Sequence, residues 1–343
     1  MTVLGTHTYE EIKTQPEAWQ DALDTVKINR LDLPPLFKDC EQVIFTGCGS
    51  TYYLSLAAAA LFQELTGISA RAVPGGDLLL YPKNTFTKQK TTLVAVSRSG
   101  STSETVKVVE RYRQQKQGPI LVVTNYGDQP LAELADVALV IAKGQESSVA
   151  QTRSFASMYV ATTAMTAWVA NQDQLADSMQ SLTEAGEKMI QKYEPGAREL
   201  GENLAYDRFY FLGSGPRYGL ACETNLKMKE MTLTHSEPFH FLEFRHGPMS
   251  MVTHTTIVAG FLSDSNRQHE QKVLDEMSEL GATVIGLGEM NAAIQFQSGL
   301  AETVRNVLYL PFLQMLAYYR SMAKGLNPDQ PSHLSAVVKL NFD

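Results

Sequence analysis

The sequence contains only three cysteines and no apolar run that is long enough to cross a membrane. Cys40, Cys48 and Cys222 are odd in number and widely spaced, which fits neither a disulfide framework nor a zinc ribbon. The longest apolar stretches, such as 54–62, fall short of the ~20 residues of a membrane-spanning helix. The N-terminal residues lack a basic segment followed by an apolar one, so no signal peptide is expected. We therefore expect a cytoplasmic protein that does not contact membranes.

An excess of positive charge is also absent. The chain has 29 basic and 37 acidic residues and a net charge of −8. This balance argues against nucleic-acid binding, because a phosphate backbone requires a basic surface. The length of 343 residues, with 44% hydrophobic and 19% charged residues, is typical of a globular protein of about two domains. Such a chain can bury enough apolar surface to fold without disulfides or metals.

Short β-branched segments alternate with helical patterns in the first half of the chain. QVIFTGCG (42–49) and TTLVAVSRSG (91–100) are predicted to be buried strands that end in glycine turns. A helix is predicted after each of them, and two further strands are predicted in GPILVVTN and ADVALVIA. This alternation predicts a mostly parallel sheet that helices cover on both faces.

The same order of elements recurs in the second half, starting with RFYFLGSG (208–215). The residues between the halves have a helical pattern, which a connection at 193–198 is expected to interrupt. We therefore predict an α/β fold of two three-layer αβα domains with mostly parallel, flavodoxin-like sheets, formed by tandem duplication. The expected segments are 1–35 (N-terminal helices), 36–195 (first domain), 196–325 (second domain) and 326–343 (C-terminal tail).

Two of the predicted turns are rich in groups that bind anions. GCGST (47–51) places backbone N–H groups at the start of a helix, and Ser50 and Thr51 add hydroxyls. SRSGSTSET (97–105) crowds hydroxyls around Gly100, and both turns follow strands of a parallel sheet. Neither turn contains a lysine or the GxxxxGK[ST] pattern, so a nucleotide P-loop is excluded. The turns indicate a phosphate that is held and not transferred, or else ordinary polar turns with helix caps.

A third segment places charges on one helix face. In ETNLKMKEM (223–231), Glu223, Lys227 and Glu230 are spaced i, i+4 and i+7. The spacing alone favours a solvent-exposed row of ion pairs. In a cleft, the same groups can move a proton next to a carbonyl.

His246 precedes Gly247 and Pro248 and is expected on a turn, as an acid or base or as an ordinary surface residue. The histidines between 235 and 254 lack the HExxH spacing, so no metal site is expected.

Together these segments resemble proteins of two sugar isomerase (SIS) domains. The similar proteins are the isomerase half of glutamine–fructose-6-phosphate aminotransferase, amino-sugar-phosphate deaminases, ketosamine-phosphate deglycases and tagatose-type ketose/aldose isomerases. GCGST and SRSGSTSET resemble the two phosphosugar turns of this family. SVAQTRSFAS (148–157) resembles a stretch that touches the sugar, and ETNLKMKE with its downstream HGP resembles the EGALKLKE…HGP block. GLNPDQPSHLSAVV resembles the tail that closes over the site.

The resemblance implies a role for each matching residue. Glu230 would move the proton between C1 and C2 of the open-chain sugar, Lys227 would support it electrostatically, and His246 would help to open the ring. The family's histidine comes from the neighbouring subunit, so a homodimer is expected. The residues implied to bind the sugar phosphate are Ser50, Thr51, Ser97, Arg98, Ser99, Thr102, Val149 and Ser335. No metal or cofactor is expected, because a carboxylate removes the proton and fixed donors stabilise the enediolate.

Two departures from the family pattern bear on the reaction. No glutaminase segment precedes the SIS region and no cysteine lies near residue 2, so ammonia from glutamine is not expected. The aminotransferases carry a lysine two residues after the leucine of the tail, whereas Leu334 is followed by Ser335 and Ala336, and the next lysine is Lys339. We therefore expect an isomerase or deaminase of hexose or amino-hexose 6-phosphates that works through an enediol. A fructosamine-type 6-phosphate deglycase and a non-catalytic phosphosugar sensor remain as alternatives.

The two halves also differ from each other. FLSDSNRQHE (261–270) stands where SRSGSTSET should recur, and the serine–glycine pattern is lost. One phosphosugar site per chain is therefore predicted.

Overall fold

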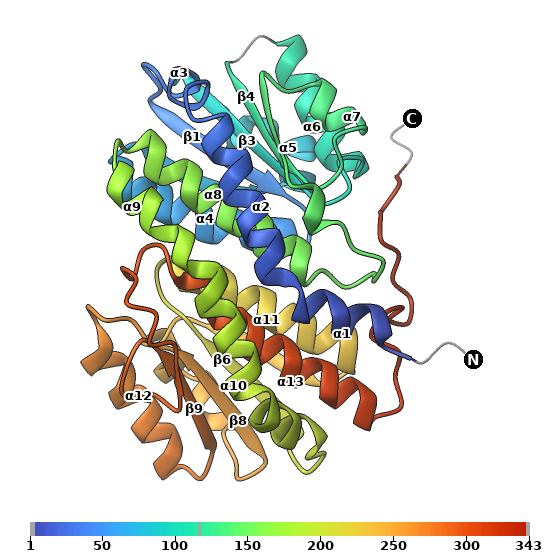
Figure 1. Ribbon diagram of the computed structural model, residues 1–343, viewed down its shortest axis with the longest axis vertical. Helices are drawn as coiled ribbons and strands as arrows, with labels where there is room; N and C mark the ends of the chain where they lie inside the picture. The colour runs from blue at the N-terminus through green and yellow to red at the C-terminus, as the bar shows by residue number, and fades with distance from the viewer. Residues whose placement is uncertain (1–3, 116–117, 341–343) are drawn as a thin grey trace. The chain divides into compact units, whose positions relative to one another are not determined.

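The structure is a computed structural model that describes residues 4–115 and 118–340 (Figure 1). The contacts divide these residues into two compact units, and each is described by itself. The first-sheet unit comprises residues 14–115, 118–146, 153–180 and 335–340. The second-sheet unit comprises residues 4–13, 147–152 and 181–334.

The first-sheet unit contains five parallel strands in the order β2-β1-β3-β4-β5. The strands are β1 (Gln42–Gly47), β2 (Ser69–Pro74), β3 (Thr91–Ser97), β4 (Ile120–Thr124) and β5 (Val137–Val140). β1, β3 and β4 are buried along their whole length, as near-continuous apolar runs in a covered parallel sheet should be. Gln42 pairs with Thr91 and Leu93 with Ile120, so the carboxyl ends of these strands share one edge.

Helices cover both faces of the first sheet. On one face, Leu78 of α5 and Val109 and Tyr112 of α6 pack with Ile44 and Leu93 of the strands. On the other face, α8 packs against α2 and α4 (Figure 1). The helices are α2 (Gln15–Ile28), α3 (Leu33–Leu36), α4 (Ser50–Thr66), α5 (Gly75–Leu80), α6 (Ser103–Gln114), α7 (Pro130–Glu133), α8 (Arg153–Val169) and α9 (Asp173–Ser178).

The second-sheet unit repeats this plan. Its parallel strands have the order β7-β6-β8-β9-β10, which is the order of the first sheet strand for strand. The strands are β6 (Arg208–Leu212), β7 (His235–Phe239), β8 (Thr256–Phe261), β9 (Thr283–Gly288) and β10 (Ile294–Gln295). The helices are α1 (Thr6–Lys13), α10 (Leu182–Glu202), α11 (Pro216–Thr232), α12 (Arg267–Glu279) and α13 (Leu310–Ala323). The predicted α/β fold of two three-layer αβα domains with parallel sheets is therefore confirmed.

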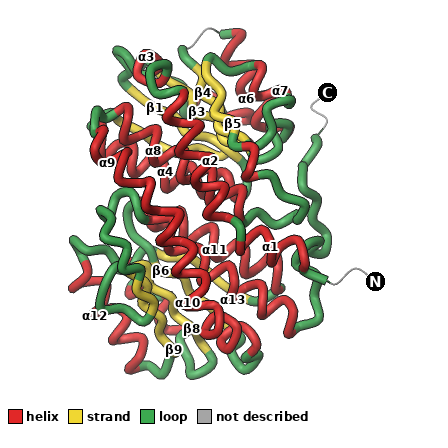
Figure 2. Tube along the Cα trace, in the orientation of Figure 1, coloured by secondary structure: helices red, strands yellow, loops and turns green. Residues whose placement is uncertain are grey.

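Short 3-10 helices connect several of these elements. They are η1 (Pro82–Asn84), η2 (Ala142–Gly144), η3 (Met179–Ser181), η4 (Glu243–Arg245), η5 (Pro248–Met251) and η6 (Asn306–Tyr309). After α13 the described chain forms only loop up to residue 340 (Figure 2).

The sequence patterns did not predict β2, β7 or β10. β2 and β7 lie next to the first strand of each sheet and are only partly buried, so they lack the apolar run that marks the central strands. β7 also contains Pro238, which an edge strand tolerates because one side of its ladder is unpaired. β10 is only two residues long.

The expected connection at 193–198 is wrong, because Pro195 lies inside α10. This helix of 21 residues packs along α13. A Cβ at Gly201 would come within 2.6 Å of the Leu316 carbonyl oxygen, so the two helices are in very close contact. The packing holds the helix together past a proline, which removes one backbone hydrogen bond. By their contacts all residues of α10 belong to the second-sheet unit, whereas a boundary at residue 195 would divide the helix.

Candidate active site

The first turn (47–51) depends on a glycine that no other residue can replace. A Cβ at Gly47 would lie 2.6 Å from the backbone carbonyl carbon of Thr51, so β1 can lead directly into α4 only through glycine. Gly49 has a φ of 57°, which also favours glycine. The Thr51 hydroxyl accepts the Cys48 N–H at 2.9 Å and donates to the Cys48 carbonyl at 3.0 Å. Ser50 and Thr51 are both buried, so the turn is fixed at the carboxyl end of β1.

The second turn (97–102) brings four hydroxyls together at the start of α6. The hydroxyl oxygens of Ser97 and Thr102 are 3.4 Å apart. Ser99 Oγ accepts the Ser101 N–H at 3.2 Å and lies 3.3 Å from Ser101 Oγ. Hydroxyls beside a helix N-terminus suit an oxyanion, because they can donate to it where the helix dipole is positive.

A cavity of about 220 Å³ opens beside the second turn. Its lining comes from the second turn, the loops after β4 and β5, and the C-terminal tail. The lining residues are Arg98, Ser99, Ser101, Tyr126, Gln129, Glu146, Ala336 and Val337. All belong to the first-sheet unit. The cavity therefore contains two of the predicted phosphate residues next to four that the sequence patterns did not single out: Tyr126, Gln129, Glu146 and Val337.

Arg98 and Glu146 form a buried charge pair in this cavity. Arg98 Nη1 lies 3.7 Å from Glu146 Oε2, and the two side chains are 6% and 0% exposed. The Ser154 hydroxyl donates a further hydrogen bond to Glu146. A buried ion requires such partners, because it loses its hydration on burial. Tyr126 and Gln129 could have been singled out from the sequence, because they follow the end of a predicted strand. No local sequence pattern marks Glu146.

The C-terminal tail lies across the start of α6. The Ser103 N–H donates to the Val338 carbonyl at 3.4 Å, and the Leu340 N–H donates to Ser103 Oγ at 3.0 Å. Ser335, a predicted sugar-binding residue, is exposed, and its hydroxyl donates to Val337 within the tail at 3.2 Å. Ser335 does not line the cavity.

Val149, the other predicted sugar-binding residue, belongs by its contacts to the second-sheet unit. Its N–H donates to the Asp329 carbonyl at 2.9 Å. Val149 is not among the residues that line the cavity.

The charged face of α11 is buried. Lys227 is 1% exposed, and its ammonium lies 3.4 Å from Glu223 Oε1 and donates to Glu230 Oε2. The Glu223 side chain is also buried, whereas that of Glu230 is 20% exposed. A solvent-exposed row of ion pairs, which the spacing favoured, is therefore wrong. Of the three groups, the Glu230 carboxylate is the one open to a ligand.

His246 lies on a turn, as expected, between η4 and η5, and its side chain is exposed. Arg245 anchors this turn through two hydrogen bonds to the Glu276 carboxylate, of 2.6 and 2.7 Å. Leu242 and Met251 on the same segment are about half exposed, at 51% and 50%. His246 lies on the turn after β7, whereas Lys227 and Glu230 lie on α11 and contact each other there.

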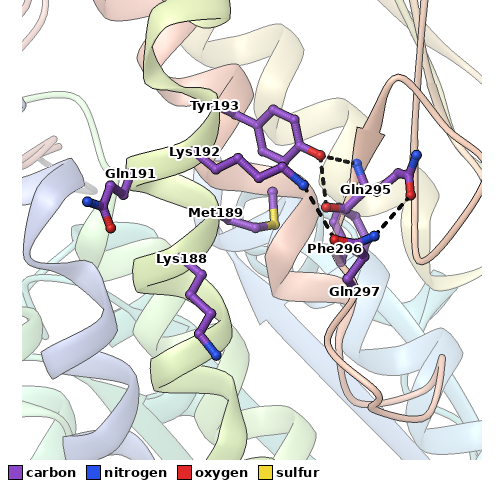
Figure 3. Close-up of a pocket in the computed structure, with 8 residues that line it drawn as sticks. All are labelled: Lys188, Met189, Gln191, Lys192, Tyr193, Gln295, Phe296 and Gln297. Carbon is purple, nitrogen blue, oxygen red and sulfur yellow. Dashed lines mark hydrogen bonds between the residues drawn. The ribbon is translucent and has the colours of Figure 1, made fainter.

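A larger cavity of about 460 Å³ lies between α10 and β10 in the second-sheet unit (Figure 3). Its lining contains none of the predicted site residues. The polar groups there bind one another, since the Tyr193 hydroxyl bonds to the Gln295 N–H and carbonyl at 2.9 and 3.1 Å, and Lys192 donates to Gln297 at 3.4 Å. This cavity is therefore a weaker candidate for a substrate site.

Across residues 4–115 and 118–340, no three His, Cys, Asp or Glu side chains are grouped in a way that could hold a metal ion. In the same residues, no helix has both the length and the apolar character required to cross a membrane.

Comparison with known families decides what kind of chain this is. The SIS domain model matches residues 36–167 and 205–297, which is more than half of the chain. The chain belongs to the SIS domain family. The two matched segments contain the strands of the two sheets, so the SIS match and the structural duplication agree.

Similar curated SIS proteins are longer than this chain. Glutamine–fructose-6-phosphate aminotransferase of Methanothermobacter thermautotrophicus is 27% identical over 96% of this chain and 56% of its own length. The enzyme of the same name from Pyrobaculum aerophilum is 28% identical over 87% of this chain and 51% of its own length. The chain thus spans about half the length of these relatives.

Solved structures of SIS proteins match nearly the whole chain. Tagatose-6-phosphate ketose/aldose isomerase from Escherichia coli has a TM-score of 0.85 and 24% identity over 96% of this chain and 97% of its own. Glucosamine-6-phosphate deaminase from Thermotoga maritima has a TM-score of 0.80 and 26% identity over 98% of this chain and 100% of its own. The fold is therefore shared with phosphosugar isomerases and an amino-sugar-phosphate deaminase.

Proposed function

We propose that this SIS protein is an isomerase or deaminase of hexose or amino-hexose 6-phosphates. The observation that carries the proposal is the buried cluster on α11, in which Lys227 contacts two carboxylates and only the Glu230 carboxylate is partly exposed. Such a pair provides a base with a fixed ammonium beside it, which is what proton removal next to a carbonyl requires. The SIS family assignment and the match to an isomerase and a deaminase support the same reaction class.

The phosphate is proposed to bind at the two hydroxyl-rich turns. The hydroxyls of Ser50, Ser97, Ser99 and Thr102, with nearby backbone N–H groups, would donate to its oxygens. The Thr51 hydroxyl would do so in place of its bond to the Cys48 carbonyl. The start of α6 adds a favourable dipole. We assign Arg98 to position the tail across this site, since its guanidinium already binds Glu146 and Ala336. Val149 and Ser335 are also proposed to contact the sugar, and for these two residues the family resemblance is the only support.

Glu230 is proposed to transfer the proton between the two carbons. It removes the proton from C2 of the open-chain aldose, and the electrons form the C1–C2 double bond of the enediolate. Glu230 then returns the proton to C1 while the hydroxyl proton on O2 moves to O1, which completes the ketose. Lys227 balances the charge of the carboxylate, and His246 would assist ring opening by moving a proton to the ring oxygen. With an amino group at C2, the same shift gives an imine at C2. Water hydrolyses this imine to the ketose and ammonia.

A homodimer is proposed, with His246 acting in the site of the partner subunit. The exposed side chains of Leu242 and Met251 beside an exposed His246 support this arrangement, because apolar side chains on a surface favour contact with another protein. We place the protein in the cytoplasm, where the free thiols of Cys40, Cys48 and Cys222 would persist.

The proposal is tested by a substrate panel without added metal. The panel contains glucosamine 6-phosphate, hexose 6-phosphates of both ketose and aldose form, and a fructosamine 6-phosphate, with the products identified by NMR. Turnover of glucosamine 6-phosphate or of a hexose 6-phosphate is expected, and Glu230→Gln should lower kcat by roughly 10³-fold. The proton shuttle is wrong if this variant keeps full activity. Cleavage of the fructosamine 6-phosphate alone would indicate a deglycase, and tight binding without turnover would indicate a sensor.

A further inference from the structure

The second-sheet unit contains its own version of the first turn. A Cβ at Gly213 would lie 2.5 Å from the Arg217 carbonyl oxygen, just as one at Gly47 would collide with Thr51. Gly215 has φ 58° and ψ −136°, and Gly49 has φ 57° and ψ −124°. The two turns thus have the same backbone path. Arg217 stands at the place that Thr51 holds in the first turn.

The second turn also has a counterpart. Arg208 pairs with Thr256 across β6 and β8, as Gln42 pairs with Thr91 across β1 and β3. Counting along the strands from these pairs, Leu262 stands at the place of Ser97, and 263–266 replaces 98–101. The hydroxyl pattern is lost there, but the backbone N–H groups still precede a helix of 13 residues, α12.

Two carboxylates of the same unit bind these N–H groups. Glu270 Oε2 accepts the Ser263 N–H at 2.6 Å and the Ser263 hydroxyl at 2.9 Å. Glu302 Oε2 accepts the N–H groups of Asp264 and Ser265 at 2.9 and 3.3 Å. Carboxylate oxygens therefore occupy the donors that an anion would use at this place.

Arg217 completes the arrangement from the other turn. Its guanidinium, in a residue that is 6% exposed, donates to Glu302 Oε1 and lies 3.7 Å from Glu270 Oε1. The carboxylates thus bridge the two turns in the way proposed for a phosphate in the first-sheet unit. Among the described residues, Arg217 Nε and Glu270 Oε1 are buried without a hydrogen-bond partner. The two carboxylates therefore leave part of the donor and acceptor capacity of this place unused.

We infer that the second-sheet unit retains an oxyanion-binding site that Glu270 and Glu302 of the same chain occupy in place of a ligand. The inference goes beyond the proposed function, because it concerns the unit that contributes no phosphate turn to it. The ligand class is a tetrahedral oxyanion such as inorganic phosphate, which carries the charge of the carboxylates and enough oxygens for the same donors. Glu302 is the removable occupant, since its side chain is 20% exposed and comes from a loop outside both turns.

The test removes this occupant and supplies an ion. Glu302→Ala leaves the N–H groups of Asp264 and Ser265 and the Arg217 guanidinium without their carboxylate. Inorganic phosphate should then raise the melting temperature of the variant by roughly 5 °C more than that of the wild type. The wild type corrects for general salting effects and for any phosphate bound at the intact first-sheet turns, which both proteins share. The comparison between variant and wild type therefore stays valid even if the protein proves not to be an isomerase or deaminase.

Two further variants make the result specific. Glu302→Ala combined with Arg217→Gln should lose the phosphate response, because the buried cation is gone. Glu302→Asp keeps a charged occupant and should respond to phosphate no more than the wild type. If Glu302→Ala does not fold alone, phosphate should restore its folding yield. The inference is overturned if phosphate rescues neither stability nor folding yield, or if the double variant responds equally.

Discussion

Arg98 donates a hydrogen bond of 2.9 Å from Nη2 to the carbonyl oxygen of Ala336. One guanidinium thus joins the second turn to the C-terminal tail, while its other nitrogen faces the buried carboxylate of Glu146. The position of the tail over the cavity depends on this contact and on three hydrogen bonds at Ser103.

Arg98→Gln should therefore loosen the tail and weaken substrate binding. We expect KM for the phosphosugar to rise roughly tenfold, the effect of losing one charge-assisted hydrogen bond, with a smaller change in kcat. Steady-state kinetics measure both constants. The control is Arg113→Gln, because Arg113 is a surface arginine of α6 paired with Asp136. An unchanged KM in a folded Arg98→Gln variant would contradict a role for the tail in binding.

Replacement of Lys227 by methionine should strongly destabilise the protein. The substitution leaves Glu223 buried without its ammonium, and breaking a buried ion pair from one side costs about 3–5 kcal/mol. Urea denaturation of the variant measures the loss. Adding Glu223→Gln to Lys227→Met removes the stranded charge, so the double variant should recover much of the stability. If the effects of the two substitutions on the free energy of unfolding simply add, Lys227 and Glu223 are not coupled.

The Glu194 carboxylate in the second-sheet unit, which accepts hydrogen bonds from Lys13, Tyr9 and Tyr319, should make stability depend on pH. Burial raises the pKa of Glu194, but hydrogen bonds from Lys13, Tyr319 and Tyr9 outweigh it and hold the pKa below its ordinary value. Stability from this group is therefore present above the ordinary value of 4.5 and is lost as the pH falls through the lower folded value.

The hydrogen bond to Glu194, followed by burial, raises the pKa of Tyr9 to about 12. Its contribution is thus complete below pH 10 and is lost as the pH rises towards 12.

Melting curves of the wild type and Glu194→Gln at several pH values measure this dependence. The difference between the two proteins should be largest near neutral pH and should shrink below pH 4.5. Glu184→Gln is the control, since Glu184 pairs with Lys188 on the surface of the same helix. If the difference in melting temperature between the wild type and Glu194→Gln stays constant down to the lowest pH, the charge of Glu194 is not the stabilising factor.

Subunit mixing should reveal whether His246 acts across a dimer. Glu230→Gln and His246→Ala are each expected to be inactive, because each removes one member of the proposed site. In a mixed dimer, one of the two sites combines an intact Glu230 with the partner's intact His246. Random mixing of equal amounts should therefore restore about a quarter of wild-type activity. No recovery, despite mixed dimers detected by native mass spectrometry, would place both residues in the same subunit.

The two hydroxyl-rich turns were predictable because their signals are local. Glycine at the end of a buried strand, followed by hydroxyls and a helix, specifies a turn by itself, as Gly47 and Gly100 show. The role of Arg98 in holding the tail was not predictable, because Ala336 lies 238 residues away in the sequence. Glu146 carries no local signal for the same reason.

The burial of Lys227 could not be predicted from its helix alone. The i, i+4, i+7 spacing describes an exposed face and a buried face equally well. Only the elements that pack against the helix, among them α13, β6 and β7, decide between them. Pro195 was misleading in the opposite direction. It indicated a break, but contacts with α13 keep α10 helical through it.

The division of the chain between the two units has a consequence for synthesis. The chain passes from one unit to the other at residues 13/14, 146/147, 152/153, 180/181 and 334/335. Folding during translation therefore cannot complete the first sheet's unit and then proceed to the second. The cavity at the second turn acquires its last walls, Ala336 and Val337, only after residue 337 has left the ribosome. A nascent chain that has already formed both sheets should still lack a closed cavity.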